Sequence, residues 1–466
     1  MSQHHSISAS TLARKIVRRE ITSEALCEDL CNRIEAHADL NAFATYDRAA
    51  LLAQAKEADV AMSLGKNRGP LHGVPVLLKD NINTSAMATS GGTPALVGNI
   101  PNVNAPIAAR LFEAGALLAG KANMHELSSG GTSANHVFGP VRNPFDKMLV
   151  PGGSSGGTAA AIAAGLAPAG LGTDTAGSVR VPAALCGVFG FRPSTGRYSD
   201  AGIVPLSRTQ DTAGPLAAAM EDIILLDSLL AVGGAHPIRH KGTNLRIGVA
   251  EHLIETASSQ ISRTIDDTLQ RLAKAGVTLV PVDLSAHTDV RRAATVGVID
   301  SEFPGVMQAY LTAHAPHLTL ESLTAQIASP SVKAFTEDRL RKVHDQAAYA
   351  YAIGDGLKAY QAVWASLFTD HTLDAIAFPT TPEVALPLAE DDNVMRNGES
   401  VLSWFYFSNT GPGSAGQRPG ISLPVGLSKP GPDQSGLPVG LELDGLPGED
   451  EHLLGVAQTV SNILDI

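Results

Sequence analysis

Cysteine is scarce in this chain: its 466 residues include only three, Cys27, Cys31 and Cys186. So small and odd a number argues against a disulfide framework and favours a reducing compartment, so we expect a cytoplasmic location. Cys27 and Cys31 lie one helical turn apart, but no histidine or further cysteine stands beside them to complete a metal site. The sequence therefore predicts no metal ion.

Positive charge is also in short supply, with 34 Lys and Arg against 46 Asp and Glu and a net charge of −12. Because basic residues nowhere form a cluster, nucleic acid and anionic membranes are poor candidate partners. The N-terminus lacks the apolar segment of a secretory signal. The longest uncharged stretch, residues 148–173, is interrupted by glycines and prolines, so it predicts a buried helix between loops rather than a membrane span.

Hydrophobic residues make up 44% of the chain, enough for a large core, and they alternate between strand-like and helix-like spacing. This alternation predicts an α/β fold, and the lack of a long linker predicts one domain over residues 1–466. The Gly- and Pro-rich residues 409–440 are expected to form surface loops around one strand. Strands are expected at 72–80, 117–123, 169–174, 245–250, 277–284, 373–378, 421–427 and 439–445. Helices are expected at 22–36, 105–116, 155–166, 259–275 and 449–464, with a long polar-faced helical pattern at 333–368.

A loop of glycine and serine, residues 151–157, leads into the Ala-rich helix and is ambiguous by itself. Such a loop can bind an anion through its backbone N–H groups, but no Gly-Lys-Ser/Thr follows as it does in nucleotide-binding loops. Residues 152–156 also match the G-x-S-x-G motif, in which Ser154 would be a nucleophile. The preceding residues make a poor strand, however, and no histidine stands in a recognisable catalytic setting. A purely structural glycine turn is the third alternative.

Two further segments have the composition of catalytic sites. Small residues follow the predicted strand at 169–174, so several backbone N–H groups can be exposed together beside Ser178. A serine hydroxyl next to such N–H groups suits acyl transfer, although Ser178 can equally be a capping residue. Lys79 ends an apolar strand, where it either reaches water or is buried. Burial would lower the pKa of the amine and make it a base.

Taken together, GVPVLLKD at 73–80, GGSSGG at 152–157 and GTDTAGSVRVPA at 172–183 resemble the amidase signature family. The resemblance is close over a signature core of about residues 70–215. It implies the amidase signature fold, one large twisted mixed β-sheet covered by helices on both faces. It also implies a serine–cis-serine–lysine triad, with Ser178 as nucleophile, Ser154 as the bridging serine and Lys79 as the base. Neither a metal nor an organic cofactor is implied.

The resemblance assigns further residues around this triad. Thr175, Ala176, Gly177 and Ser178 would supply the N–H groups that bind the oxyanion, and Ser128 would border the leaving amide. Ser155, Asp174 and Arg180 would support the loop. One position departs from the family pattern, because Ala176 stands where a glycine is usual. A positive φ at that position would strain alanine, and its methyl group would narrow the approach to the nucleophile.

Residues 79–96, 123–144 and 191–215 further resemble the indoleacetamide and mandelamide hydrolases, which release ammonia from small aryl-substituted amides. The run Trp404-Phe405-Tyr406-Phe407 is notable because aromatic residues are only 5% of the chain. These four residues either form ordinary core or, if some of them face the pocket, provide a surface against which an aryl group is buried. Two alternatives stay open, the amide-hydrolysing subunit of a tRNA-dependent amidotransferase and a catalytically silent scaffold. A homodimer is also left open.

Overall fold

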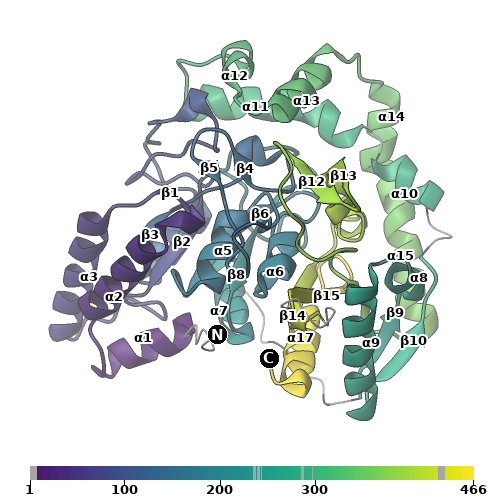
Figure 1. Cartoon of the computed structure of the whole chain (residues 1–466), viewed down its shortest axis with the longest axis horizontal. Helices are drawn as coiled ribbons and strands as arrows, with labels where there is room; N and C mark the ends of the chain where they lie inside the picture. The colour runs from purple at the N-terminus through teal and green to yellow at the C-terminus, as the bar shows by residue number, and fades with distance from the viewer. Residues whose placement is uncertain are drawn as a thin grey trace.

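The computed structural model describes residues 8–234, 238, 242, 244–284, 288–295, 297–428 and 436–466. Within them, eleven strands form one mixed sheet (Figure 1). Parallel pairing joins β2 to β3 and β6, whereas the pairs from β6 through to β11 are antiparallel. In spatial order the strands are β1 (Phe43–Thr45), β3 (Leu117–Ala122), β2 (Pro75–Lys79), β6 (Ala169–Asp174), β8 (Thr212–Ala217), β7 (Phe189–Arg192), β14 (Gly420–Leu427), β15 (Pro438–Asp444), β11 (Ala375–Pro379), β9 (Arg246–Val249) and β10 (Thr278–Pro281).

Helices cover both faces of this sheet, which confirms the predicted α/β fold. All eight predicted strands are present; β1, β7 and β8 were not predicted. One face carries α1 (Ala9–Val17), α4 (Pro106–Glu113), α7 (Met220–Leu230), α9 (Ser259–Lys274) and α17 (Asp450–Leu464). The other carries α2 (Ser23–Ala36), α3 (Arg48–Ser63), α5 (Gly156–Ala163) and α6 (Arg180–Cys186).

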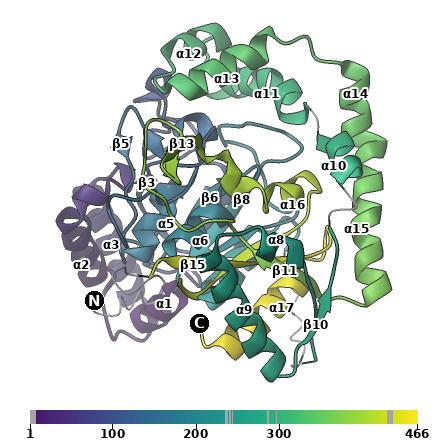
Figure 2. The same cartoon turned by 45° about the vertical axis from the view of Figure 1, so that its right-hand side comes forward.

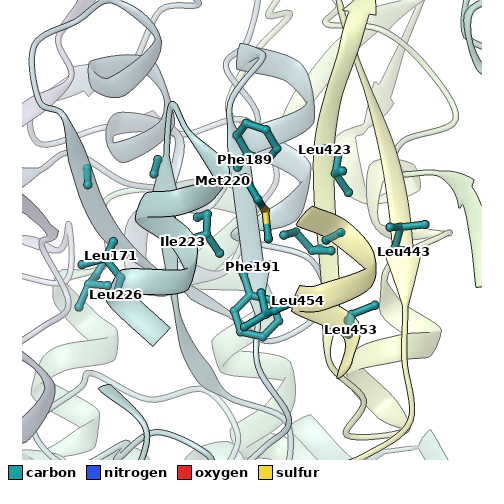
Figure 3. Packing of buried hydrophobic residues seen from close by; sticks show 14 of the residues in the cluster. Leu171, Phe189, Phe191, Met220, Ile223, Leu226, Leu423, Leu443, Leu453 and Leu454 are labelled. Carbon is teal, nitrogen blue, oxygen red and sulfur yellow. The ribbon is translucent and has the colours of Figure 1, made fainter. Parts of the chain in front are cut away.

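The larger hydrophobic core lies between the first face and its helices (Figure 3). Side chains of α7 and α17 meet Phe189 and Phe191 of β7, all of them buried. Alternate residues of a strand point to opposite faces, so Val76 and Leu78 of β2 enter this core while Leu77 enters the core on the other face. β2 is therefore buried on both sides, so the residue at its carboxyl end lies in the interior of the molecule.

A second group of helices arches over the edge of the sheet at which β2 and β6 end. In both views α11 to α13 lie along the top of the molecule, and α14 and α15 descend along the right side (Figures 1 and 2). These helices are α11 (Val298–His314), α12 (Leu320–Gln326), α13 (Pro330–Arg341), α14 (Gln346–Tyr351) and α15 (Leu357–His371). Three short helices remain: α10 (Thr288–Thr295), which contacts α15 and α16 (Gly411–Ala415), and α8 (Glu251–Glu255), which contacts β11. Two small hairpins complete the described elements, β4 (Ala134–Asn135) with β5 (Gly139–Pro140) and β12 (Asn393–Arg396) with β13 (Glu399–Leu402).

Two sequence expectations need correction. The helical pattern at 333–368 is not one helix, because the backbone of Lys342 is extended and ends α13, and a new helix starts after Asp345. The Asp345 side chain accepts hydrogen bonds from the N–H groups of Ala347 and Ala348, which is the usual role of an N-cap.

The Gly-rich residues 409–420 are not surface loops. Thr410, Ser414 and Arg418 are all at least 99% buried, and β14 lies inside the sheet between β7 and β15. Small residues are found here because neighbouring groups come close: a Cβ on Gly420 would lie 2.6 Å from a carboxylate oxygen of Asp444. Residues 429–435 of the same expected loop lie outside the described residues.

The uncharged stretch 148–173 forms a loop, α5 and β6. Among the described residues, no helix is both long and apolar enough to cross a membrane.

Candidate active site

Lys79 ends β2 and is completely buried. Its ammonium nitrogen, Nζ, lies 2.7 Å from Ser154 Oγ and 2.8 Å from Thr173 Oγ1, so two hydroxyls receive its hydrogen bonds. Burial lowers the pKa of Lys79 to about 7, against the opposing effect of the Asp174 and Asp211 carboxylates. A large fraction of the amine is therefore neutral near pH 7, which is the form that can accept a proton.

Ser154 lies in the loop before α5, and a cis peptide bond joins it to Gly153. Residues 141–153 form no strand, so the strand–turn–helix setting of a G-x-S-x-G nucleophile is absent from this part of the described chain. The carbonyl of Ser154 accepts the backbone N–H of His125 at 3.1 Å. On the other side, Gly153 packs so tightly that a Cβ there would lie 2.8 Å from the Gly130 carbonyl oxygen. The Ser154 hydroxyl is thus fixed towards Lys79.

Ser178 lies in the turn between β6 and α6 and is 6% exposed. Its carbonyl accepts the N–H of Ser155 at 3.2 Å, which ties the two serine segments together. In the part of the chain that the structure describes, the backbone N–H groups of Ala176, Gly177 and Ser178 donate no hydrogen bond. The turn therefore offers a hydroxyl and neighbouring N–H donors within one small space, as the sequence predicts.

Positive φ falls on Gly177, at +140°, and not on Ala176. The strain considered for alanine at position 176 is therefore not found. Gly177 is the position that must remain glycine, because a Cβ there would lie 2.1 Å from Thr410 Oγ1. The same Thr410 hydroxyl donates to the Ala176 carbonyl at 2.8 Å, so it fixes the turn from outside.

A buried ion network lies beneath this turn. Asp174 accepts hydrogen bonds from the N–H of Val179 and from the guanidinium groups of Arg180 and Arg192, each 3.1 to 3.2 Å away. Burial opposes ionisation of Asp174, but Arg180 and Arg192 outweigh it and hold the pKa of this carboxyl well below its usual range. Arg180 also pairs with Glu442 of β15 at 2.9 Å. The network joins the turn to three strands of the sheet.

The remaining predicted site residues surround the same centre. Thr175 donates to Asp211 at 2.6 Å, and Ser128 accepts a hydrogen bond from Asn81 at 3.3 Å. The Ser155 hydroxyl donates to the Thr173 carbonyl and accepts the Thr173 N–H, both at 3.2 Å. The structure therefore brings all ten predicted residues together: Lys79, Ser128, Ser154, Ser155, Asp174, Thr175, Ala176, Gly177, Ser178 and Arg180.

Two cavities lie near the turn at residues 175–178 (the catalytic turn of the proposal below), and α11 lines both. One, of 350 Å³, is bordered by Ser128 and Thr175 and by the second half of α11. The other, of 720 Å³, is bordered by Trp404, Phe407 and the first turn of α11. Phe407 lies against the catalytic turn, because a Cβ on Gly177 would be 3.2 Å from its ring.

The aromatic run divides between cavity and core. Trp404 and Phe407 border the larger cavity. Tyr406 is fully buried and donates its hydroxyl to the Val384 carbonyl at 2.8 Å. The Phe405 ring packs against Tyr406 and Arg396.

Sequence reasoning missed several residues that hold the site. Thr173 and Asn81 stand within the recognised motifs, so their polar side chains next to Lys79 and Asp174 were a usable signal. Arg192 and Asp211 lie in the resembling segment 191–215, so they too could have been noticed. Thr410 gave no such signal, because only the fold brings it to the turn.

In the described part of the chain, no group of three or more His, Cys, Asp or Glu side chains is arranged to bind a metal ion. Cys27 and Cys31 are buried in α2 as free thiols.

A buried lysine on a serine hydroxyl, close to a second serine whose neighbouring N–H groups have no partner among the described residues, is the arrangement expected of an acyl-transferring hydrolase of the Ser-Ser-Lys class. Comparison with known proteins identifies the group within that class. A family model described as Amidase matches residues 25–454, and the chain belongs to this family. The protein is accordingly an amidase, a hydrolase of carboxylic amides.

Individual relatives match over nearly the whole chain. This chain is 40% identical to a mandelamide hydrolase of Pseudomonas putida, over 97% of this chain and 91% of that protein. It is 38% identical to an indoleacetamide hydrolase of Agrobacterium vitis, over 98% of this chain and 97% of that protein. Among solved structures, the peptide amidase of Stenotrophomonas maltophilia has a TM-score of 0.82 at 28% identity and covers 99% of this chain and 98% of its own.

The geometry of the turn predicts the effect of Gly177→Ala. We expect at least a hundredfold loss of kcat/KM, because the methyl group displaces Thr410 and moves the N–H groups, and one lost oxyanion donor costs about 10²–10³ in rate. The matched control is Gly196→Ala, where φ is also positive, at +86°, but no atom lies within 4 Å. Steady-state kinetics and thermal unfolding of both variants separate the two effects. Equal kcat/KM in the two variants would contradict the prediction.

Proposed function

We propose that this amidase hydrolyses its substrate through a Ser178 acyl-enzyme, with Ser154 as proton relay and Lys79 as base. The observation that carries the proposal is the 2.7 Å contact between the buried Lys79 Nζ and Ser154 Oγ, made by an amine whose pKa is about 7. An ordinary lysine is protonated at neutral pH and cannot accept a proton. Burial here supplies the neutral amine that such a relay needs.

The proposed steps keep protons and bonds in balance. Neutral Lys79 takes the Ser154 proton while Ser154 takes that of Ser178, whose oxygen attacks the amide carbon. The tetrahedral intermediate collapses as the relay returns one proton to the departing nitrogen, which leaves as ammonia or an amine. Water then attacks the acyl-enzyme by the reverse route and releases the acid. The N–H groups of residues 176–178 would bind the oxyanion in both halves.

For the substrate, we propose a small aryl-substituted primary amide. Two observations support this class. The relatives include proteins named for mandelamide and indoleacetamide. The 720 Å³ cavity is bordered by Trp404 and Phe407, and the Phe407 ring touches the turn that carries Ser178. An aromatic contact adds about 0.5–1.5 kcal/mol beyond the area that it buries.

We further propose that residues 1–466 act as one catalytic domain in the cytoplasm. Strands from both ends of the chain share the sheet, and the buried thiols suit a reducing compartment.

Substitution of the two serines tests the relay. Ser178→Ala should abolish turnover while the protein stays folded, because the nucleophile is lost. Ser154→Ala should lose less, since a water molecule can replace a relay hydroxyl. The measurement is single-turnover acylation with mass detection of the acyl-enzyme, alongside thermal unfolding. An active Ser178→Ala together with a dead Ser154→Ala would assign the nucleophile to Ser154 instead.

The pKa of Lys79 predicts the pH profile. Below about pH 7 the amine is protonated and cannot take the Ser154 proton, so kcat/KM should rise through about pH 7 and level off above it. Lys79→Arg should be nearly inactive at every pH, because a guanidinium stays protonated. A profile that is flat from pH 6 to 8, or an active arginine variant, would remove Lys79 as base.

Substrate preference is tested by kcat/KM for acetamide, hexanamide, phenylacetamide, mandelamide and indoleacetamide. We expect the aryl members to exceed the aliphatic ones by about two- to twelvefold for each aromatic contact made in the transition state. Equal or faster turnover of hexanamide would contradict the aryl proposal. Activity of the purified chain alone also distinguishes it from an amidotransferase subunit, which would need its partner subunits.

A further inference from the structure

Asp392 is a buried carboxylate with an unusual set of partners. It precedes β12, and its side chain is completely buried. Within the described ranges no lysine or arginine pairs with it, and the nearest basic group is the Nδ1 atom of His125 at 3.8 Å. Its partners are neutral donors instead. A charged acceptor forms stronger hydrogen bonds than a neutral one, so each donor is held firmly.

The side chain of Asp392 holds two different segments. Oδ1 accepts the backbone N–H of Gly131 at 2.8 Å and the hydroxyl of Ser403 at 2.7 Å. Oδ2 accepts the indole N–H of Trp404 at 2.8 Å. One carboxylate therefore connects the loop at 127–133 with the aromatic turn at 403–407, two segments that are far apart in the chain.

The Gly131 end of this connection leads to Ser154. A Cβ on Gly153, the residue before Ser154, would lie 2.8 Å from the carbonyl carbon of Gly131, so the two backbones are in direct contact. The loop needs support, because Leu127 and Ser128 both have left-handed backbones, with φ of 48° and 57°. Side chains other than glycine adopt this region only when their surroundings fix it.

The Trp404 end leads to the larger cavity. The indole lies 4.6 Å from the ring of Phe335 in α13 and is 42% exposed, so it forms part of the cavity wall without being buried in the core. The hydrogen bond from the indole N–H to Asp392 restrains the orientation of this partly exposed ring. Asp392 therefore anchors the indole.

We propose that Asp392 is a positioning residue that fixes the Trp404 wall of the substrate cavity relative to the Ser154 loop. It sets the distance between the group that would contact an aryl substrate and the serines that act on its amide. This inference rests on the proposed function for its substrate. The anchoring of Trp404 can nevertheless be measured without any substrate.

The variants Asp392→Asn and Asp392→Ala distinguish the contact of Asp392 with Trp404 from its contacts with Gly131 and Ser403. Asparagine keeps a carbonyl oxygen for Gly131 and Ser403 but presents an amide N–H₂ to the indole N–H, so only the Trp404 contact is lost. We expect kcat/KM for phenylacetamide to fall about tenfold, mainly through KM, with less than a twofold change for hexanamide. Alanine releases both ends, so kcat for hexanamide should fall as well.

Two further variants make the test specific. Trp404→Phe should reproduce the loss of Asp392→Asn, and the double variant should lose no more than either single one, because both remove the same contact. The matched control is Asp391→Asn. That carboxylate holds Ser329 and Ser331 of the α13 start but makes no contact with Trp404, and its substitution should leave the aryl-to-aliphatic ratio unchanged.

Acrylamide quenching of Trp404 fluorescence, obtained by subtracting the Trp404→Phe spectrum from that of the parent, provides a readout independent of turnover. The quenching constant should rise in Asp392→Asn and stay unchanged in Asp391→Asn. Independent, multiplying losses from Asp392→Asn and Trp404→Phe, or unchanged quenching in Asp392→Asn, would overturn the proposal. If the wild-type enzyme shows no aryl preference, the proposed substrate class fails, and the quenching experiment still decides the role of Asp392.

Discussion

Burial of Lys79 at the end of β2 is the constraint on which the rest of the site depends. An ammonium group in the middle of a protein is costly unless it is neutralised or fully hydrogen-bonded. Here the fold supplies two hydroxyls, from Ser154 and Thr173, and places the nearest carboxylates close enough to moderate the pKa without restoring its usual value. β2 lies between β3 and β6 and packs into cores on both faces, so the lysine cannot withdraw to water.

The neighbouring turn is stabilised by charge rather than by apolar packing. Asp174, Arg180 and Arg192 are all completely buried, and each is matched by opposite charge. Breaking such a buried pair typically costs about 3–5 kcal/mol, although replacing the whole pair by apolar groups is often neutral. The directional bonds from Asp174 to the Val179 N–H and to both guanidinium groups hold the turn in one conformation. The N–H groups of residues 176–178 take no part in this network and have no partner among the described residues.

Around this fixed centre, segments from later in the chain contribute walls to both cavities. α11 lines both cavities, and α13 and the turn at 403–407 border the larger one. Phe407 touches the turn at Gly177, whereas Trp404 is held by Asp392. The proposed catalytic groups thus lie at the end of β2 and in the loops before α5 and after β6, and much of the wall of the larger cavity comes from segments packed onto the sheet.

Sequence by itself determined the periodic elements and the motif-bearing residues. Strands buried on both faces read as short apolar runs, and the small residues of the serine loops are required by close backbone contacts, so both are visible locally. The sequence also indicated Lys79, Ser154 and Ser178 through motifs that lie within about a hundred residues. Tertiary structure alone decided that Arg418 and the Gly-rich residues around it are buried and that the pattern at 333–368 breaks at Lys342. It alone brought Thr410 to Ala176 and Asp392 to Gly131. These contacts join segments more than two hundred residues apart, and no local periodicity records which distant donor meets which acceptor once the chain has folded.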